Sequence, residues 1–416
     1  MKFYFPDSQD QVSPTYDFIH DEYSPLRVRQ RDDRYAHEVL AQPAYNGLLV
    51  SKAIVDGTIK GVGKYSMPQR QRLYRLGVRR FFRLPNDIAT LGDCGAFTYV
   101  NEPEPPYSVS EVIDFYSGCG FDAGVSIDHV ILGYRRPGTA DDDIPDEWKE
   151  RRLISLHYGE KFLSAVEDQG HPFQPVGAAQ GWSPASYADS VKELQAMGYK
   201  RIALGGMVAL KTPDILACLD AIADVRADDT ELHLLGITRL ESMTDFAQLG
   251  VTSFDSTSSF RQSFMDDRDN YHTTDTTYAA IRVPQVDGNV LLKKAILSGK
   301  VSQAAAVRAE RESLRRLREY DAGSCDLDAA LDAVLEYETL VGVKKTYRDQ
   351  YRRTLEYTPW RECACGLCGK HGIEMIMFRG SERNKRRGFH NLSVLADRMR
   401  SLHVAQSRTM ERMASG

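Results

Sequence analysis

Three cysteines and a later histidine have the types and spacing of a metal site. Cys363, Cys365 and Cys368 lie within six residues, and His390 follows after 21 intervening residues. Thiolates this close together can converge on one ion, and an imidazole can complete a tetrahedral set of ligands for zinc. Four protein ligands leave no coordination position for water, so the sequence predicts one structural Zn²⁺ per chain. His371 competes for the fourth position, and His390 is preferred because its neighbours resemble the entry to a helix with an inward histidine.

A second group of candidate residues lies at the ends of short apolar runs that are typical of strands or, for Asp93, in a Gly-rich loop after the second strand region. Its members are Asp93, Asp128, Gln180, Gly205, Gly206, Met207 and Asp255. Each alone has an ordinary explanation, because an aspartate at a strand end is most often a helix N-cap and a Gly-Gly pair is most often a tight turn. Three acids at the ends of buried strands are nevertheless an unfavourable arrangement unless they serve a function.

Two carboxylates at one site can catalyse displacement at a sugar carbon. One acts as the nucleophile and the other as the general acid/base, as in retaining glycosidases. The third acid, the amide and the glycine backbone are suited to binding a planar polar ligand. A metal-dependent barrel hydrolase is disfavoured because no His-x-His pair ends a strand.

The elements that must position these residues alternate along the chain. Ser183–Met197 and Thr212–Ala223 have apolar residues at helical spacing, and short apolar runs flank them. The predicted strands are Gly47–Ser51, Val78–Arg83, Ala123–Ile127, Pro175–Ala179, Arg201–Leu204, Leu232–Gly236 and Val251–Phe254, with an eighth at Lys2–Phe5 or near Phe97–Val100. Regular alternation from about residue 123 to 255 indicates parallel β–α units.

Seven or eight such units in about 250 residues favour an α/β fold of the (β/α)8 TIM-barrel type over an open sheet. No Gly-x-Gly-x-x-Gly turn supports dinucleotide binding. We therefore predict a TIM barrel with a C-terminal helical, zinc-binding subdomain. The predicted domains are an N-terminal extension (1–45), the barrel (46–300), the helical zinc-binding subdomain (301–405) and a flexible tail (406–416).

The charge distribution argues against a generally basic nucleic-acid binder but permits a local phosphate-binding surface. The net charge is -5, yet Lys64 to Arg83 contains seven basic and no acidic residues. Arg379 to Arg400 contains seven basic and two acidic residues. The candidate nucleic-acid contacts are Arg79, Arg80, Arg83, Lys385, Arg386 and Arg387.

The chain shows no apolar run of transmembrane length and no signal peptide at its N-terminus. Three of its seven cysteines are clustered, which fits a reducing compartment better than a disulfide framework. We expect a soluble, cytoplasmic protein that does not contact membranes.

From about residue 45 to about residue 395 the chain resembles the tRNA-guanine transglycosylases, which are (β/α)8 barrels with a zinc-binding insertion. The Cys-x-Cys-x2-Cys pattern with a distant histidine matches. Gly250-Val251-Thr252-Ser253-Phe254-Asp255-Ser256 is similar to the nucleophile segment of the family, and Asp93-Cys94-Gly95-Ala96-Phe97 to the loop with the second catalytic acid. Ala179-Gln180-Gly181 and Ala203-Leu204-Gly205-Gly206 match the base-binding segments, and Asp128 matches the guanine-reading aspartate.

Within this family the N-terminal residues resemble the DNA-modifying branch. Phe3-Tyr4-Phe5-Pro6-Asp7-Ser8 and Asp33-Arg34-Tyr35-Ala36-His37-Glu38 are similar to the DpdA-type enzymes, which insert a 7-deazaguanine into DNA. DNA is therefore the implied polymer, and a transglycosylase acting on tRNA is the alternative. A third possibility, from another class, is a catalytically silent, zinc-stabilised subunit that binds nucleic acid.

The resemblance implies a base exchange with retained configuration. Asp255 would attack C1′ and expel guanine, and Asp93 would serve as the acid/base. The incoming base would be 7-cyano-7-deazaguanine (preQ0). Asp128, Gln180, Gly205, Gly206 and Met207 would bind the base. The DNA-modifying relatives also imply a helper ATPase that opens the duplex, and a homodimer is possible.

Overall fold

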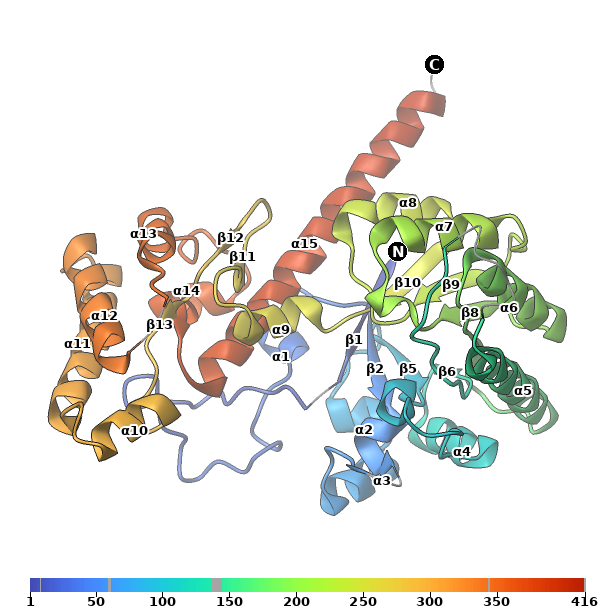
Figure 1. Cartoon of the computed structure of the whole chain (residues 1–416), viewed down its shortest axis with the longest axis horizontal. Coiled ribbons are helices and arrows are strands. Elements are labelled where there is room, and N and C mark those ends of the chain that lie inside the picture. The colour runs from blue at the N-terminus through green and yellow to red at the C-terminus, as the bar shows by residue number, and fades with distance from the viewer. Residues whose placement is uncertain (8, 59–60, 137–143, 343–344, 415–416) are drawn as a thin grey trace. The chain divides into compact units, whose positions relative to one another are not determined.

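The computed structural model describes residues 1–416 except 8, 59–60, 137–143, 343–344 and 415–416. The chain forms two compact units (Figure 1). The first unit contains Met1–Gln9, Tyr45–Thr257 and Ala405–Gly416, and the second contains Asp10–Ala44 and Ser258–Val404.

Eight parallel strands of the described chain close into a barrel in the first unit, in the order β1-β10-β9-β8-β7-β6-β5-β2. They are β1 (Lys2–Pro6), β2 (Gly47–Ser51), β5 (Ala89–Asp93), β6 (Ala123–Val125), β7 (Gln174–Ala179), β8 (Arg201–Leu204), β9 (Glu231–Leu234) and β10 (Val251–Asp255). Strand β1 pairs with both β2 and β10 and so closes the barrel. The predicted (β/α)8 barrel is confirmed, and its eighth strand is the N-terminal one.

Helices cover the outside of the barrel (Figure 1). They are α2 (Lys52–Asp56), α3 (Met67–Phe82), α4 (Val109–Cys119), α5 (Asp146–Asp168), α6 (Pro184–Met197), α7 (Thr212–Ala223) and α8 (Met243–Gln248). Short 3₁₀ turns η1 (Ala96–Tyr99), η3 (Met207–Ala209) and η4 (Leu240–Ser242) and a hairpin of β3 (Gly57–Thr58) and β4 (Gly61–Val62) lie in the connections. Helix α6 begins as predicted, because Ser183 Oγ caps it by accepting from Ser186 N at 3.2 Å.

One predicted strand is wrong. Val78–Arg83 is not a strand, because Val78 to Phe82 form the second half of α3, after a kink at Gly77 (φ +75°). Val78, Phe81 and Phe82 are all buried, which is the i, i+3, i+4 pattern of a helix face. The strand that fills this place in the barrel is β5.

The second unit is mainly helical. Its elements are α1 (Ala36–Val39), α9 (Ser258–Met265), β11 (Tyr271–His272), β12 (Thr277–Tyr278), β13 (Ile281–Arg282), α10 (Val290–Leu297), α11 (Gln303–Asp321), α12 (Leu327–Val341), α13 (Arg348–Tyr357), α14 (Leu367–His371), η5 (Gly372–Met375), β14 (Met377–Phe378) and, as far as Val404, α15 (Gly380–Ala414). This unit starts at Ser258 rather than at the predicted boundary near 300, and it includes most of the predicted N-terminal extension. The predicted flexible tail continues α15 as far as Ala414, and its last two residues lie outside the described part.

Buried arginines of α15 hold the segment 10–44 in place. Arg383 and Arg379 both donate to Asp21, and Glu382 accepts from Ser13 N at 3.0 Å. Arg386 is 2% exposed and donates to Glu382 and to the Ser13 carbonyl oxygen. These side chains belong to the internal structure of the second unit.

This burial corrects two of the candidate nucleic-acid contacts, Arg386 and Arg387. Arg387 is fully buried and donates to the carbonyl oxygens of Ser263, Met375 and Met377. A guanidinium that is buried and hydrogen-bonded inside its own unit cannot reach a phosphate group on the surface.

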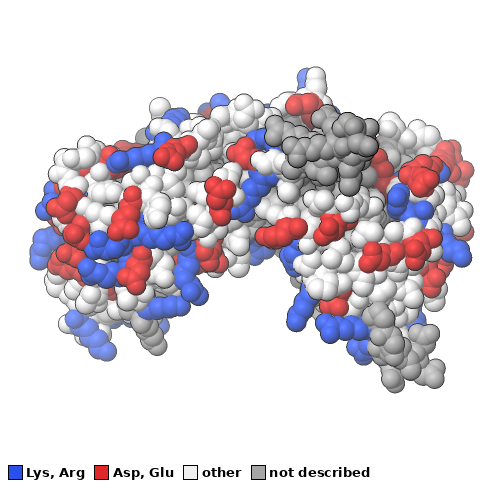
Figure 2. All heavy atoms as spheres, turned by 90° about the horizontal axis from the view of Figure 1, so that it is seen from above, with Lys and Arg blue, Asp and Glu red and all other residues white. Residues whose placement is uncertain are grey.

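Basic and acidic side chains are interspersed on the face seen in Figure 2, without one extended basic surface. Among the described residues, none of the helices combines the length and the apolar character needed to cross a lipid bilayer.

The ring of a tyrosine of α4 leaves no space for a side chain at one position on each of two barrel strands, β5 and β6. Tyr116 donates to the Val125 carbonyl oxygen at 2.9 Å, and a Cβ added to Gly92 or Gly124 would lie 2.3 or 2.2 Å from its ring. We expect Gly124→Ala to destabilise the protein by about 1–3 kcal/mol through overpacking. Gly118→Ala on α4 is the matched control, because its added Cβ meets nothing within 4 Å. Urea unfolding measures both, and equal stabilities would contradict this packing.

Candidate active site

The polar residues predicted to form a site all lie at or after the carboxyl ends of barrel strands. Asp93 is the last residue of β5 and Asp255 the last of β10. Gln180 follows β7 directly, and the pair Gly205-Gly206 follows β8. Because all eight strands are parallel, these ends open at one mouth of the barrel.

Asp128 and Gln180 form a buried pair at this mouth. Gln180 Nε2 donates to Asp128 Oδ2 at 2.6 Å, and Cys94 Sγ donates to Asp128 Oδ1 at 3.2 Å. The Ile131 N–H donates to Gln180 Oε1 at 3.2 Å, which fixes the orientation of the amide. Burial raises the pKa of Asp128, and the two side-chain donors oppose this shift.

The two glycines after β8 are required by close approach. A Cβ on Gly205 would lie 2.1 Å from Gln180 Nε2, and a Cβ on Gly206 would lie 2.6 Å from the Ile131 carbonyl oxygen. Gly206 also has a φ of +77°, which disfavours any residue with a side chain. Met207 follows as the first residue of η3 and is fully buried. The backbone at this point therefore packs directly against Gln180 and Ile131.

Asp93 titrates near neutral pH. Burial and the negative charges of Asp128 and Asp255 raise its pKa to about 7, although the backbone N–H groups of Gly95 and Cys94 donate to it. A carboxyl group with this pKa can both give and take a proton near neutral pH. The charges of Asp128 and Asp255 both act on Asp93 from the same mouth of the barrel.

Asp255 is held through one oxygen. The Gly236 N–H donates to Oδ1 at 3.0 Å, and His233 Nε2 lies 3.2 Å from the same atom. The Asp255 residue is 6% exposed. Its carboxylate is thus oriented by the end of strand β9 and the residues that follow it.

Sequence reasoning missed two supporting residues, Tyr99 and His233. Tyr99 donates to Cys94 Sγ at 3.0 Å and to the Asp128 carbonyl oxygen at 3.1 Å, from the 3₁₀ turn η1. His233 interrupts an apolar strand between Leu232 and Leu234, and this polar residue in a buried run was the available signal.

The remaining candidate nucleic-acid contacts differ in their exposure and in the contacts that they make within the protein. Arg79 donates to both carboxylate oxygens of Asp122, at 3.0 and 2.8 Å, and Arg83 ends α3 in a left-handed conformation (φ +54°). Arg80 is exposed and Lys385 is partly exposed.

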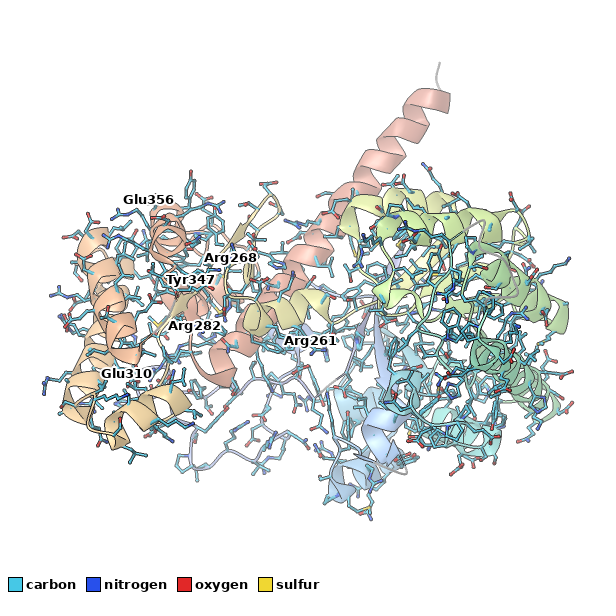
Figure 3. All side chains as sticks on the ribbon, viewed as in Figure 1. Arg261, Arg268, Arg282, Glu310, Tyr347 and Glu356 are labelled. Carbon is cyan, nitrogen blue, oxygen red and sulfur yellow. The ribbon has the colours of Figure 1, made fainter. Side chains whose placement is uncertain are left out.

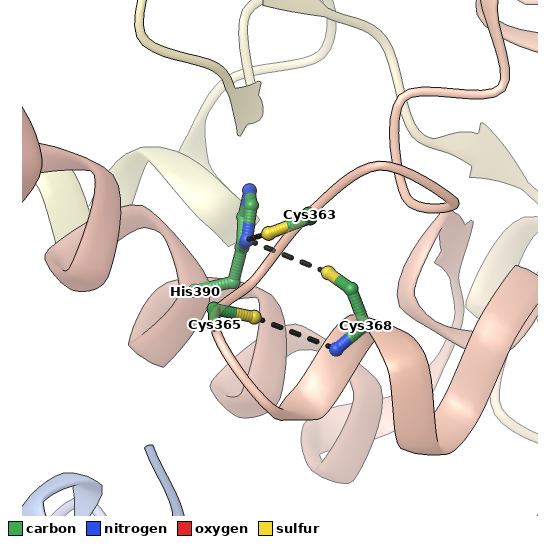
Figure 4. Close-up of side chains that lie close together, drawn as sticks. All are labelled: Cys363, Cys365, Cys368 and His390. Atoms are coloured by element: carbon green, nitrogen blue, oxygen red, sulfur yellow. Dashed lines mark hydrogen bonds between the residues drawn. The ribbon is translucent and has the colours of Figure 1, made fainter. Parts of the chain in front are cut away.

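The predicted metal ligands come together in the second unit (Figure 4). One ligand atom from each of Cys363, Cys365, Cys368 and His390 lies within 4.8 Å of the others. His371 is not part of this group, so the choice of His390 is confirmed. Cys363 and Cys365 lie before α14, Cys368 is in its first turn, and His390 is on α15.

The geometry fits one tetrahedrally bound ion. His390 Nδ1 lies 3.3 Å from Cys363 Sγ and 3.5 Å from Cys368 Sγ, close to the roughly 3.6 Å between ligands of a tetrahedral Zn²⁺. His390 Nε2 lies 2.7 Å from the His272 carbonyl oxygen, so it carries the proton and leaves Nδ1 free to bind a metal. The Tyr271 ring stacks on His390 at 4.0 Å. The group could therefore hold one metal ion.

No model of a protein family matches the chain. A curated protein of Salmonella montevideo, named DNA-guanine transglycosylase, is 48% identical over 404 residues, which cover 96% of this chain and 96% of that protein.

Removing one thiolate tests the metal centre. We expect Cys365→Ser to lose its bound metal and to lower Tm by roughly 10 °C, because a structural metal contributes several kcal/mol of folding free energy. Metal content by mass spectrometry and Tm by calorimetry measure the two effects. Cys325→Ser and His371→Ala lie outside the group and should keep one equivalent of metal. One equivalent retained in Cys365→Ser would contradict the assignment.

Proposed function

The chain belongs to the DNA-guanine transglycosylase family and is a base-exchanging pentosyltransferase, and on that premise we propose that it replaces guanine in DNA with 7-cyano-7-deazaguanine through a covalent glycosyl-aspartate. The observation that carries this proposal is the set of three carboxyl groups at one barrel mouth, in which burial, with the nearby charges of Asp128 and Asp255, raises the pKa of Asp93 to about 7. Such a set supplies a nucleophile, an acid/base and a group that binds the base.

The exchange takes two displacements. In the first, the Asp255 carboxylate bonds to C1′ of the deoxyribose, the C1′–N9 bond breaks, and Asp93 gives its proton to the departing guanine. In the second, the Asp93 carboxylate takes the proton from N9 of the incoming base, which attacks C1′ and releases Asp255. Two inversions retain the configuration and return both carboxyl groups to their starting states.

Guanine presents N1–H and 2-NH₂ donors on one edge, and Asp128 offers two acceptor oxygens. Gln180 and the backbone of Gly205 and Gly206 lie beside this carboxylate, with Gly205 Cα close enough that a Cβ would be 3.4 Å from Asp128 Oδ2. 7-Cyano-7-deazaguanine has the same donor edge, so one pocket can accept both the departing and the incoming base. The choice of this base comes from the family resemblance.

We assign the metal as Zn²⁺, held by Cys363, Cys365, Cys368 and His390. Three thiolates and one imidazole are a donor set typical of structural zinc. When bound, the ion supplies a cross-link that braces the second unit. The reaction itself uses the carboxyl groups of the barrel.

Contacts to the phosphate backbone come from exposed basic residues. Arg80 and Lys385 remain from the sequence-based candidates, whereas Arg79 and Arg83 have structural contacts of their own. Arg261 and Arg268, labelled in Figure 3, are exposed on α9 and in the residues after it, and α9 begins three residues after Asp255. Phe264 and Met265 are exposed in the same segment, at 37% and 64%, and could stack against an unpaired base.

The target base must leave the helical stack, which costs a few kcal/mol. A net charge of -5 provides little general attraction to DNA. We propose that a helper ATPase opens the duplex, as the resemblance to the DNA-modifying enzymes implies. A DNA substrate fits a cytoplasmic location. A homodimer remains our proposal for the assembly.

Radiolabelled guanine tests the function. The purified protein is offered duplex DNA, single-stranded DNA and unmodified tRNA, and we expect label to enter DNA only. Asp255→Ala should reduce incorporation by about 10⁴-fold or more, as expected for loss of a nucleophile.

Asp228→Ala, a change at an exposed aspartate, is the control for the charge lost. Label in tRNA alone would assign the protein to the tRNA-modifying alternative. No label in any polymer, even after cell extract is added, would indicate a silent subunit.

The pH dependence tests the role of Asp93. Its pKa is raised from about 3.8 to about 7. The protonated form that serves the departing guanine is therefore present below this pH and lost above it. We expect kcat/KM for guanine release to fall about tenfold per pH unit well above pH 7. Stopped assays in matched buffers measure it, with Asp93→Asn as the inactive reference. A rate that stays constant from about pH 6 to 9 would exclude Asp93 as the acid.

A further inference from the structure

A chain of buried polar side chains runs through the barrel interior to Asp255. Arg201 Nη2 on β8 donates to Ser253 Oγ at 3.3 Å, and Ser253 Oγ lies 2.8 Å from His233 Nδ1. His233 Nε2 then lies 3.2 Å from Asp255 Oδ1. All four residues are no more than 6% exposed.

Both ends of this chain fix the direction in which its hydrogens point. A guanidinium can only donate, so Ser253 Oγ accepts from Arg201 and its own hydrogen is free to bond His233 Nδ1. At the other end the Asp255 carboxylate can only accept, so His233 Nε2 must carry the ring hydrogen. The opposite tautomer would place a nitrogen lone pair against a carboxylate oxygen.

The surroundings keep His233 neutral. Burial lowers the pKa of His233, and the charge of Arg201 acts in the same direction, while the Asp255 carboxylate opposes both. The Tyr4 ring packs edge-on against the imidazole, with centroids 5.7 Å apart. A neutral donor orients the carboxylate without forming a full ion pair, which would weaken it as a nucleophile.

Arg201 is the cationic end of this series of hydrogen bonds. Within the described residues it makes no ion pair, and its Nε has no hydrogen-bond partner. Its guanidinium lies 5.5 Å from the centre of the Tyr4 ring. A buried cation is unfavourable without a compensating anion. The chain of bonds connects this cation to the Asp255 carboxylate.

We propose that Arg201, Ser253 and His233 are positioning residues that fix Oδ1 of Asp255 and leave Oδ2 as the oxygen that attacks C1′. Oδ1 accepts from both Gly236 N and His233 Nε2, whereas Oδ2 accepts from no described residue. When the Oδ2–C1′ bond forms and the C1′–N9 bond breaks, Oδ1 becomes the carbonyl oxygen of the ester and keeps both donors. This inference rests on the proposed function, because it concerns the nucleophile of that reaction.

Ser253→Ala tests the series of hydrogen bonds by removing the hydroxyl group at its centre. We expect kcat to fall about 10- to 100-fold with KM within about twofold, the range for losing one hydrogen bond that acts on a charged group. Without the serine hydrogen, Nδ1 can take up a proton, so the acidic limb of the pH profile should move to higher pH. Ser253→Thr keeps the hydroxyl group and should recover most of the rate.

Ser313→Ala in the second unit is the matched control for stability. The buried hydroxyl of Ser313 donates to the Ala309 and Ala333 carbonyl oxygens. We expect this variant to have a lower Tm and an unchanged kcat. If Ser253→Ala lowers Tm and leaves kcat unchanged, as this control does, the positioning role is overturned.

Nitrogen NMR of protein labelled with ¹⁵N-histidine reads the tautomer without any activity assay. His233→Gln assigns the signal, and we expect the Nε2–H form in the wild type and a mixture of tautomers in Ser253→Ala. An Nδ1–H or doubly protonated ring at neutral pH would overturn the inference. A wild-type protein that exchanges no base on any polymer would instead remove the proposed function, and the NMR signal would still decide the hydrogen-bond chain.

Discussion

The structure depends on one electrostatic constraint, the gathering of three carboxyl groups at the mouth of a parallel barrel. Like charges in a partly dehydrated site repel each other, so each acid needs its own set of donors. Asp128 has two side-chain donors, Cys94 and Gln180, and Asp255 has Gly236 and His233. Among the described residues the donors to Asp93 are the backbone N–H groups of Gly95 and Cys94, and its pKa is raised to about 7. The placement of donors thus gives three chemically identical groups different surroundings, which is the basis for the different roles that we propose for them.

The sequence predicted the barrel and its mouth because parallel strands leave local signals. Each strand is a short apolar run, and its functional residue comes at or just after its end. Strand β5 was missed because Thr90 and Gly92 interrupt its few apolar residues, whereas the apolar residues of α3 resembled a strand when their spacing of three and four was overlooked. The metal ligands were found because three of the four lie within six residues.

The arginine run of α15 shows where local pattern fails. Arg383 and Arg386 bond to Asp21 and to the Ser13 carbonyl oxygen, which lie more than 360 residues away in the sequence. Nothing near residue 380 indicates these partners, so the run resembled a solvated phosphate-binding surface. A similar long-range contact supports the loop that contains the cysteines of the candidate metal site, where the Ala41 N–H donates to the Cys365 carbonyl oxygen at 3.0 Å. The segment 10–44 thus belongs to the second unit, although its own sequence is polar and irregular.

The interior of the barrel is divided between two kinds of packing. On β2, β5, β6 and β7 the inward residues include Leu49, Leu91, Val125 and Val176, which fill the core as in an ordinary barrel. On β8, β9 and β10 the same interior contains Arg201, His233 and Ser253. Buried polar groups each cost about 1–3 kcal/mol unless they are hydrogen-bonded, so a core of this kind is a poor way to gain stability alone. Because these three strands are neighbours and the last of them ends in Asp255, the polar side of the interior is the side that holds the proposed nucleophile.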